Sequence, residues 1–318
     1  MFDVTALGEL LIDFSPAGRS DSGYPVMAAN PGGAPANFLA ALQRYGCRTA
    51  LIAKVGDDAF GRLLKESVRG TGADVSAVIA DPDVFTTLAF VSLDGNGERT
   101  FSFARKPGAD TRLAPEEVPE DLIASSRVFH FGTLSLTDEP AASATRRALE
   151  LARKHKLLIS ADPNLRLPLW RSGEEARAAM EWCLRQADIV KISDDEVRFL
   201  WDESPEKGAE RLLAEYGARL VYVTCGAKGC CAANAKACVR VPAPAGIRPV
   251  DTTGAGDIFG GAAMSRLLGT GRTPEELTEN ELESIVRFAC AAASLSTQRT
   301  GGIASVPAPE EVLTLAGS

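Results

Sequence analysis

Two carboxylates, two hydroxyls and a turn of small residues occur together in the run DTTGAGD at positions 251–257. A helical pattern follows over 258–268. Gly254, Ala255 and Gly256 leave the backbone amides at the helix start uncovered, and unpaired N–H groups at the positive end of a helix dipole bind anions. Asp257 would repel a phosphate held there, unless it removes a proton from the hydroxyl that attacks that phosphate. The run therefore predicts an anion hole with Asp257 as general base. The alternative is an ordinary helix start at which Asp257 only favours the dipole.

Polar or glycine-rich residues also follow three of the expected strands, at the point where each strand ends. These strands cover 157–161, 189–192 and 220–224, and they lead into the runs DPNLR, SDDE and CGAKG. Because ligands of open parallel sheets bind beyond the carboxyl ends of the strands, we expect a nucleotide crevice at this edge. The chain has no Gly-x-x-x-x-Gly-Lys-Ser/Thr run, which excludes a P-loop kinase.

Composition excludes several other classes of protein. The chain carries 34 Lys and Arg against 42 Asp and Glu, a net charge of −8 with no basic run, which argues against nucleic acid and membrane as partners. There are only two histidines, and His130 lies in an apolar run typical of a core residue, which argues against a histidine zinc site or a Ser-His-Asp triad. Seven cysteines without a C-x-x-C spacing indicate reduced thiols. The start lacks a basic region and no apolar stretch could span a bilayer, so we expect a cytoplasmic protein.

Short apolar runs alternate with helical patterns along most of the chain. Strands are expected at 4–7, 49–55, 128–131, 157–161, 189–192 and 220–224. Helices are expected at 36–45, 61–71, 141–155, 174–186, 205–216, 258–268 and 279–296. Alternation of this kind predicts an α/β sandwich with a mainly parallel sheet, and we treat 1–318 as a single domain.

Two segments interrupt this alternation and are expected to form a lid, at about 13–31 and 86–110. The segment from Thr86 to Arg105 alternates with period two around a turn at 94–97, which predicts a β-hairpin. Phe101, Phe103 and Arg105 would share one face of it. Two aromatics and an arginine suit a flap over a polar ligand, and the alternative is a hairpin packed on its own domain with Arg105 in solvent.

The sequence resembles the ribokinase-like carbohydrate kinases over nearly its whole length. The run at 251–260 looks like their C-terminal signature, and GGAPAN at 32–37 looks like their N-terminal one. The resemblance implies a three-layer αβα sandwich with a small β-sheet lid. It also implies ATP-dependent phosphorylation of a hydroxyl on a sugar or a nucleoside.

The same resemblance implies roles for individual residues. Sugar binding falls to Asp13, Gly32, Gly33, Asn37, Phe103, Arg105 and Arg166. ATP binding falls to Asn164, Lys191, Ser193, Thr224, Gly226, Gly229 and Cys290, the last standing where many relatives place an asparagine. Ser193 and Glu196 resemble an Asn-x-x-Glu element that orders hydrated Mg²⁺ through Glu196, although the pair also matches a helix capping box. Asp251, Thr253 and Ser305 match a monovalent-cation site, here for K⁺, shared with carbonyls around 299–301.

Two further stretches of sequence narrow the choice of substrate. The stretch 101–110 is similar to the lid motif of fructokinases, whereas 162–166 with Trp170 fits fructokinases and ketodeoxygluconate kinases alike. Arg105 and Arg166 could orient a sugar and the transferred phosphoryl group, or grip a substrate carboxylate. We expect a fructokinase that makes fructose 6-phosphate. Alternatives are a ketodeoxygluconate, other sugar or nucleoside kinase, and a sugar sensor without turnover. A homodimer would cover the exposed hairpin edge.

Overall fold

The structure is a computed structural model that describes residues 1–93 and 99–317. Within them, a central sheet of nine strands has the order β13-β12-β11-β10-β9-β8-β1-β4-β5. Along this order, every pair of neighbouring strands between β11 and β5 is parallel, and β12 and β13 add an antiparallel edge beside β11. The bounds are β1 Phe2–Leu7, β4 Thr49–Gly56, β5 Val78–Asp81, β8 Ser126–Gly132, β9 Leu158–Asp162, β10 Ile189–Ser193, β11 Leu220–Thr224, β12 Cys230–Asn234 and β13 Cys238–Val241.

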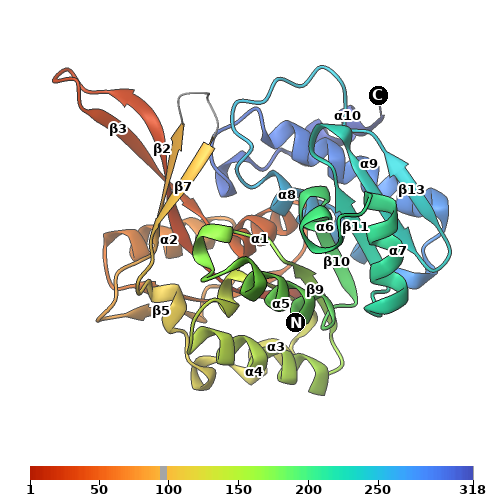
Figure 1. Ribbon diagram of the computed structural model, residues 1–318, viewed down its shortest axis with the longest axis horizontal. Helices are drawn as coiled ribbons and strands as arrows, with labels where there is room; N and C mark the ends of the chain where they lie inside the picture. The colour runs from red at the N-terminus through yellow and green to blue at the C-terminus, as the bar shows by residue number, and fades with distance from the viewer. Residues whose placement is uncertain (94–98, 318) are drawn as a thin grey trace.

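Helices cover both faces of this sheet and make the predicted three-layer α/β sandwich (Figure 1). One layer contains α1 Ala34–Arg44, α2 Ala59–Gly70, α8 Ala255–Thr270, α9 Glu279–Ser296 and α10 Pro309–Gly317. The other contains α3 Glu120–Ala124, α4 Ala141–Lys154, α5 Gly173–Leu184, α6 Asp194–Trp201 and α7 Pro205–Glu215.

Alternate residues of the central strands enter two different hydrophobic cores. In β11, Leu220 and Tyr222 pack on the side of α8 and α9, whereas Val221 and Val223 pack on the side of α4 to α7. This follows from the period of two of a strand, which sends successive side chains to opposite faces. Because both faces are buried, the strands read in the sequence as continuous apolar runs.

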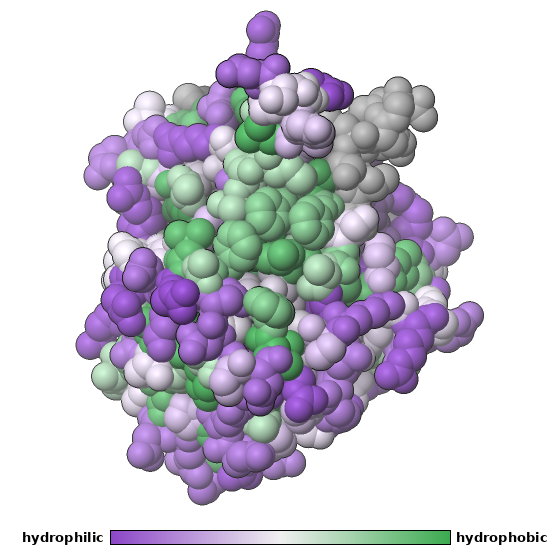
Figure 2. All heavy atoms as spheres, turned by 90° about the vertical axis from the view of Figure 1, so that its left-hand side faces the viewer, coloured by the Kyte–Doolittle hydropathy of each residue, from purple (hydrophilic) through white to green (hydrophobic). Residues whose placement is uncertain are grey.

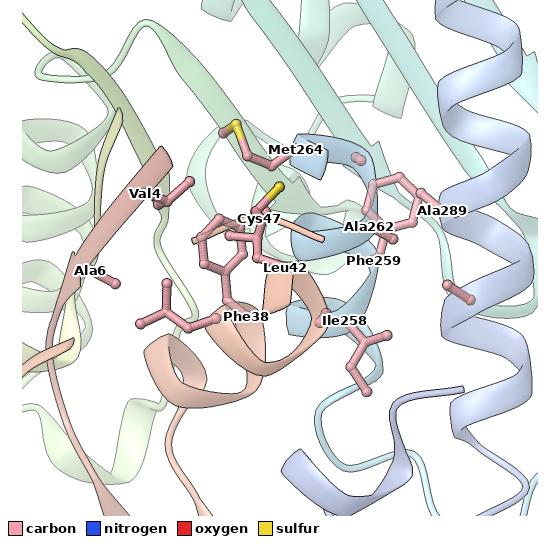
Figure 3. Packing of buried hydrophobic residues seen from close by; sticks show 14 of the residues in the cluster. Val4, Ala6, Phe38, Leu42, Cys47, Ile258, Phe259, Ala262, Met264 and Ala289 are labelled. Carbon is pink, nitrogen blue, oxygen red and sulfur yellow. The ribbon is translucent and has the colours of Figure 1, made fainter. Parts of the chain in front are cut away.

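The helix that begins at the anion turn packs closely against α1. Figure 3 shows Phe38 and Leu42 of α1 lying between the sheet and α8, with Ile258 and Met264 on the α8 side. A methyl group at Gly261 would lie 2.5 Å from the Phe38 carbonyl oxygen and 2.7 Å from Ala41 Cβ. Gly261 therefore allows the two backbones to approach.

A second sheet of four strands, β3-β2-β6-β7, forms the lid. Its bounds are β2 Leu11–Arg19, β3 Pro25–Gly32, β6 Leu88–Leu93 and β7 Arg99–Ala104. The register aligns Asn30, Asp13, Ala89 and Phe103 in one row across the sheet. Phe14 faces the other way, stacked on Phe90 at 5.2 Å and edge-on to Phe60 of α2 at 5.6 Å. Asp13 and Phe103 thus share the inner face of the lid.

All the expected strands and helices are present, with ends that differ by up to three residues. The segment at 13–31, expected only as part of the lid, forms the paired strands β2 and β3. The antiparallel pairing of β6 with β7 confirms the hairpin, while its turn at 94–97 lies outside the described residues. Four further elements, α3, α6, α10 and β5, and the antiparallel edge formed by β12 and β13 were not predicted from the sequence. His130 is a buried core residue as predicted, stacked on Phe38 at 3.8 Å.

Candidate active site

A cleft of about 870 Å³ lies where the carboxyl ends of the central strands meet the inner face of the lid. Most of the predicted site residues line it. These are Asp13, Gly33, Asn37, Phe103, Asn164, Arg166, Lys191, Ser193, Glu196, Thr224, Gly226, Thr253, Gly254, Gly256 and Asp257. The fold therefore brings together predicted site residues that lie up to 244 positions apart in the sequence, from Asp13 to Asp257.

Asp257 lies in the first turn of α8, directly after an uncapped turn. Gly254 is the N-cap and has φ of 76°, a left-handed conformation that favours glycine, and no side chain caps the helix. Within the described chain, the amides of Gly256 and Asp257 have no protein acceptor. Asp257 Oδ2 accepts a hydrogen bond from Asn37 Nδ2 at 2.9 Å. An anion hole and a fixed carboxylate are thus adjacent.

The environment of Asp257 favours a proton acceptor near neutral pH. Burial, and then repulsion from Asp162, raise the pKa of Asp257 to about 6. Lys191, the hydrogen bond from Asn37 and Arg166 lower it and so oppose this rise. A carboxylate with this pKa is ionised at pH 7, yet basic enough to accept a proton from an alcohol during transfer.

Asp13 projects from β2 at the lid end of the cleft. Burial raises the pKa of Asp13 to about 7, against a lowering by Arg166. A methyl group at Gly32 would lie 2.3 Å from Asp13 Oδ2, so glycine leaves room for this carboxylate. Asn30 was not predicted; its amide donates to the Asp13 carbonyl at 3.1 Å and steadies the strand.

Glu9 is a second residue that the sequence analysis missed. It is 4% exposed, lines the cleft, and accepts a hydrogen bond from the Ala34 amide at the start of α1 at 2.9 Å. Burial raises the pKa of Glu9 to about 7. It follows the end of β1, so the rule that located polar residues after three other strands would also have located Glu9.

Arg105 occupies a different environment from the one predicted. Its guanidinium is buried, with Nη2 2.7 Å from Asp110 Oδ2, Nη1 bonded to Thr137 Oγ1 at 2.7 Å, and Nη2 bonded to the Leu134 carbonyl at 2.8 Å. It is not among the residues that line the cleft, and it does not lie in solvent. Arg105 joins β7 to the segment after β8, whereas Arg166 does line the cleft.

A second pocket, of about 300 Å³, adjoins the cleft and shares Thr224, Gly226 and Gly256 with it. Gly229 and Cys290 line this pocket, as does Ala255. Its outer wall comes from the loop after β13, through Ala243, Pro244, Ile247 and Pro249. No role was predicted for this loop, because an apolar wall depends on shape and carries no sequence motif.

Two carboxylates predicted to act near cations hold the backbone. Glu196 accepts from the amides of Leu165 at 2.7 Å and Ser193 at 2.8 Å, and completes a capping box with Ser193, as the alternative predicted. Asp251 accepts from the amides of Thr253 at 2.9 Å and Gly301 at 3.0 Å. Ser305 is buried and donates to the Gly302 carbonyl at 2.8 Å. No group of three or more His, Cys, Asp or Glu side chains suited to a metal occurs in the described ranges.

The seven cysteines form no disulfide in the part of the chain that is described. No helix there is long and apolar enough to cross a membrane.

Comparison with known proteins places this architecture among carbohydrate kinases. The model of the pfkB family of carbohydrate kinases matches residues 1–309. Fructokinase-1 of Zea mays is 42% identical over 316 residues, which cover 98% of this chain and 97% of that protein. Fructokinase-2 of Solanum lycopersicum is 39% identical over 315 residues, or 98% and 95% of the two chains.

A solved structure shows the same fold. It is a double mutant of the fructokinase from Vibrio cholerae O395 in a form bound to fructose, ADP and a potassium ion. It matches with a TM-score of 0.87 and 30% identity, covering 99% of this chain and 98% of that one.

Proposed function

The chain belongs to the pfkB family of carbohydrate kinases and is a sugar kinase, and from this premise we propose that it is an ATP-dependent fructokinase that makes fructose 6-phosphate. The observation that carries the proposal is the cleft itself. Asp257 lies there beside the uncapped start of α8, and Asp13 faces the same cleft from the lid. Identities of 39–42% to plant fructokinases over 98% of the chain support fructose as the acceptor.

The geometry supports in-line transfer with Asp257 as base. Asp257 removes the proton of the 6-hydroxyl while that oxygen forms a bond to the γ-phosphorus of ATP. The bond from this phosphorus to the bridging oxygen breaks, and ADP leaves with the electron pair. The free amides of Gly256 and Asp257 stabilise charge on the transferred group, with Gly254 and Ala255 keeping the turn bare.

Asp13 is proposed to bind sugar hydroxyls, because charge-assisted hydrogen bonds to a carboxylate are strong. Gly32 leaves room for this carboxylate, Gly33 lets the backbone of Glu9 and Leu10 approach, and Phe103 would cover the sugar from β7. Asn37 is also proposed to bind the sugar, and its amide donates a hydrogen bond to Asp257. The single-domain organisation of 1–318, with the lid as part of it, remains a prediction.

The nucleotide is proposed to span the two pockets. Asn164, Ser193, Thr224 and Gly226 line the cleft toward the phosphates, and Gly229 and Cys290 line the pocket for the base. Mg²⁺ would neutralise the triphosphate. Both Glu196 oxygens already hold the backbone, so this carboxylate fits a hydrated ion that keeps its waters and suits no direct coordination.

A monovalent cation such as K⁺ is proposed beside Asp251. This buried carboxylate ties the segment before the anion turn to the loop at 299–302, and Thr253 and Ser305 lie on the two sides of that connection. A cation there would order the turn from behind. The potassium ion in the Vibrio cholerae fructokinase structure supports this choice of ion.

Arg105 bears on the choice between fructose and ketodeoxygluconate. A grip on a substrate carboxylate by both arginines would need two guanidinium groups in the cleft. Arg166 is there, but the guanidinium of Arg105 is bonded to Asp110, Thr137 and Leu134. With one arginine available, the neutral sugar is favoured.

Steady-state release of ADP from Mg·ATP tests the proposal with fructose, 2-keto-3-deoxygluconate, ribose, tagatose and adenosine as acceptors. We expect kcat/KM for fructose to exceed the others by on the order of a hundredfold, the discrimination that differential binding can supply. A preference for ketodeoxygluconate would keep the kinase and replace the substrate. Binding of sugar without ADP release would instead indicate the sugar sensor.

We further propose that the protein is a cytoplasmic homodimer that pairs through the outer side of its lid. Figure 2 views the molecule from this side and shows apolar residues gathered below a hydrophilic tip. Tyr24 and Val26 of the lid are 72% and 41% exposed, and Phe85, in the loop between β5 and β6, is 79% exposed. Contact with a second copy would cover such a surface. Measuring the mass of the protein in solution tests whether it is a dimer.

A further inference from the structure

Lys191 and Asp162 form a buried ion pair beside the proposed base. Lys191 Nζ lies 2.9 Å from Asp162 Oδ2, and the two side chains are 13% and 8% exposed. The register that pairs Ala161 of β9 with Val190 of β10 places them side by side one residue further along. The pair is therefore fixed by the central sheet and not by flexible surface side chains.

The ammonium group of Lys191 also reaches the turn that carries Asp257. A methyl group added at Gly256 would lie 2.8 Å from Lys191 Nζ, so the lysine packs against this backbone. Lys191, Asp162 and Asp257 together line an internal cavity of about 20 Å³, room for about one water molecule. Charges that meet in such a space are weakly screened and act strongly on one another.

Other polar groups surround Asp257 from several elements. They are Asn37 of α1, Arg166 after β9, Asp13 of β2, and Glu9 and His130, which line the same small cavity. Burial, followed by repulsion from Lys191, lowers the pKa of His130 to about 3, so this histidine is neutral. Among the described residues, Lys191 is the cation that lines both the small cavity and the cleft.

The two members of the pair act on Asp257 in opposite directions. After burial, Asp162 is the largest cause that raises the pKa of Asp257, and Lys191 is the largest that lowers it. Burial alone would lower the pKa of Lys191, but attraction to Asp162, Glu196 and Asp257 raises it, so the lysine stays charged. Its ammonium donates to Asp162, while Asp257 takes its hydrogen bond from Asn37.

We propose that Lys191 is a positioning residue for the base: it keeps Asp257 charged, while Asp162 holds the ammonium away from a direct ion pair with that base. A direct pair would occupy the carboxylate oxygen that must accept the proton. The catalytic meaning of this arrangement rests on the proposed function, but the charge arrangement itself is a property of the fold. It differs from the simpler role of Lys191 as a ligand of the ATP phosphates.

Three variants test the proposal: Lys191→Met, Asp162→Asn, and the two combined. We expect Lys191→Met to move the acid limb of the pH profile of kcat/KM for fructose up by about one pH unit or more, because nearby charges shift a carboxyl pKa by 1–3 units. Asp162→Asn should move the limb down. The double variant should return close to wild type, and it also removes the unpaired buried aspartate that could unfold Lys191→Met.

A titration of Asp257 that needs no turnover separates this proposal from the proposed function. Carboxyl ¹³C resonances of aspartate-labelled protein are followed against pH, and the Asp257 signal is identified by its loss in Asp257→Asn. In this titration we expect the pKa of Asp257 to rise in Lys191→Met and to fall in Asp162→Asn. If they appear without fructose turnover, the fructokinase proposal fails and the charge arrangement stands.

Two outcomes would overturn the inference. The first is that Lys191→Met raises the KM for ATP and leaves the Asp257 titration unmoved, which would make Lys191 a phosphate ligand only. The second is that both single variants lower the melting temperature, while neither the pH profile nor the Asp257 titration moves in opposite directions in the two variants. The pair would then serve the stability of the sheet alone.

Discussion

At the scale of single residues, Asp257 combines two properties that oppose each other in most proteins. It is withdrawn from water, which raises its pKa to about 6, and it keeps a hydrogen bond and a nearby cation that favour its charged form. Its unperturbed value would be 3.8. A carboxylate near 4 would be a weaker base, and one well above 7 would be protonated in the cell. The site therefore holds Asp257 between these limits.

Asp257→Asn tests this residue directly. We expect kcat to fall by about two to four decades, the usual contribution of a positioned general base, with fructose binding retained because Asp13 is untouched. The remaining rate should lose its acid limb near pH 6, since asparagine does not titrate. Asp121→Asn on the exposed surface of α3 is the matched control. Turnover within tenfold of wild type would exclude Asp257 as the base.

At the scale of elements, α8 brings the base to the substrate, and its packing on α1 sets the position of both. Asn37 lies on α1 and bonds Asp257 of α8 at 2.9 Å, so any change in their separation reaches the base. Two glycines of α8 test this contact as a matched pair. Gly261 lies against Phe38 and Ala41, whereas a methyl group at Gly269 would meet nothing within 4 Å.

Gly261→Ala should destabilise the fold by about 1–3 kcal/mol through overpacking and should lower kcat. Gly269→Ala should leave kcat unchanged and stabilise by up to about 1 kcal/mol, because alanine is the better helix former. Chemical denaturation gives the stabilities, and ADP release gives the rates. Equal effects of the two substitutions would show that α1 and α8 are free to adjust.

How far the sequence reveals this site depends on the kind of interaction. Asp257 and its turn were predictable because a run of seven residues contains the whole arrangement. The positions of Asn164, Ser193 and Thr224 followed from one rule about strand ends. Period-two alternation predicts that Arg105 shares a face with Phe103, but the bond from its guanidinium to Asp110 depends on how the hairpin meets the next layer, which no local pattern encodes. The apolar wall at 243–249 was missed for the same reason.

At the scale of the whole molecule, a chain of net charge −8 must bind a highly charged anion. The overall field opposes this, so local groups have to supply the attraction. The bare start of α8, Arg166 and Lys191 do so in a cleft that Asp13 and Glu9 also line. The carboxylates suit hydroxyl donors, and the cations together with the bare helix start suit phosphate, as expected of a site for a sugar and ATP.

The lid and the central layers are joined by the buried Arg105, and this connection gives the last prediction. Arg105→Met would leave Asp110 buried and unpaired, which typically costs about 3–5 kcal/mol. Asp110 would keep its bond from Thr87 Oγ1, but a neutral hydroxyl does not replace the charge of the guanidinium. Adding Asp110→Leu removes that buried charge, and the double variant should recover most of the lost stability.

Stability and substrate affinity separate the two roles of Arg105. If it anchors the lid, Arg105→Met lowers the midpoint of denaturation, and the double variant restores the midpoint together with the KM for fructose. If it binds the sugar, KM rises equally in the single and double variants, because neither contains the guanidinium. Arg166→Met is the comparison, since Arg166 lines the cleft: its KM should rise while its midpoint stays near wild type. The structure favours the first outcome, because the Arg105 guanidinium is buried and is already bonded to Asp110, Thr137 and the Leu134 carbonyl.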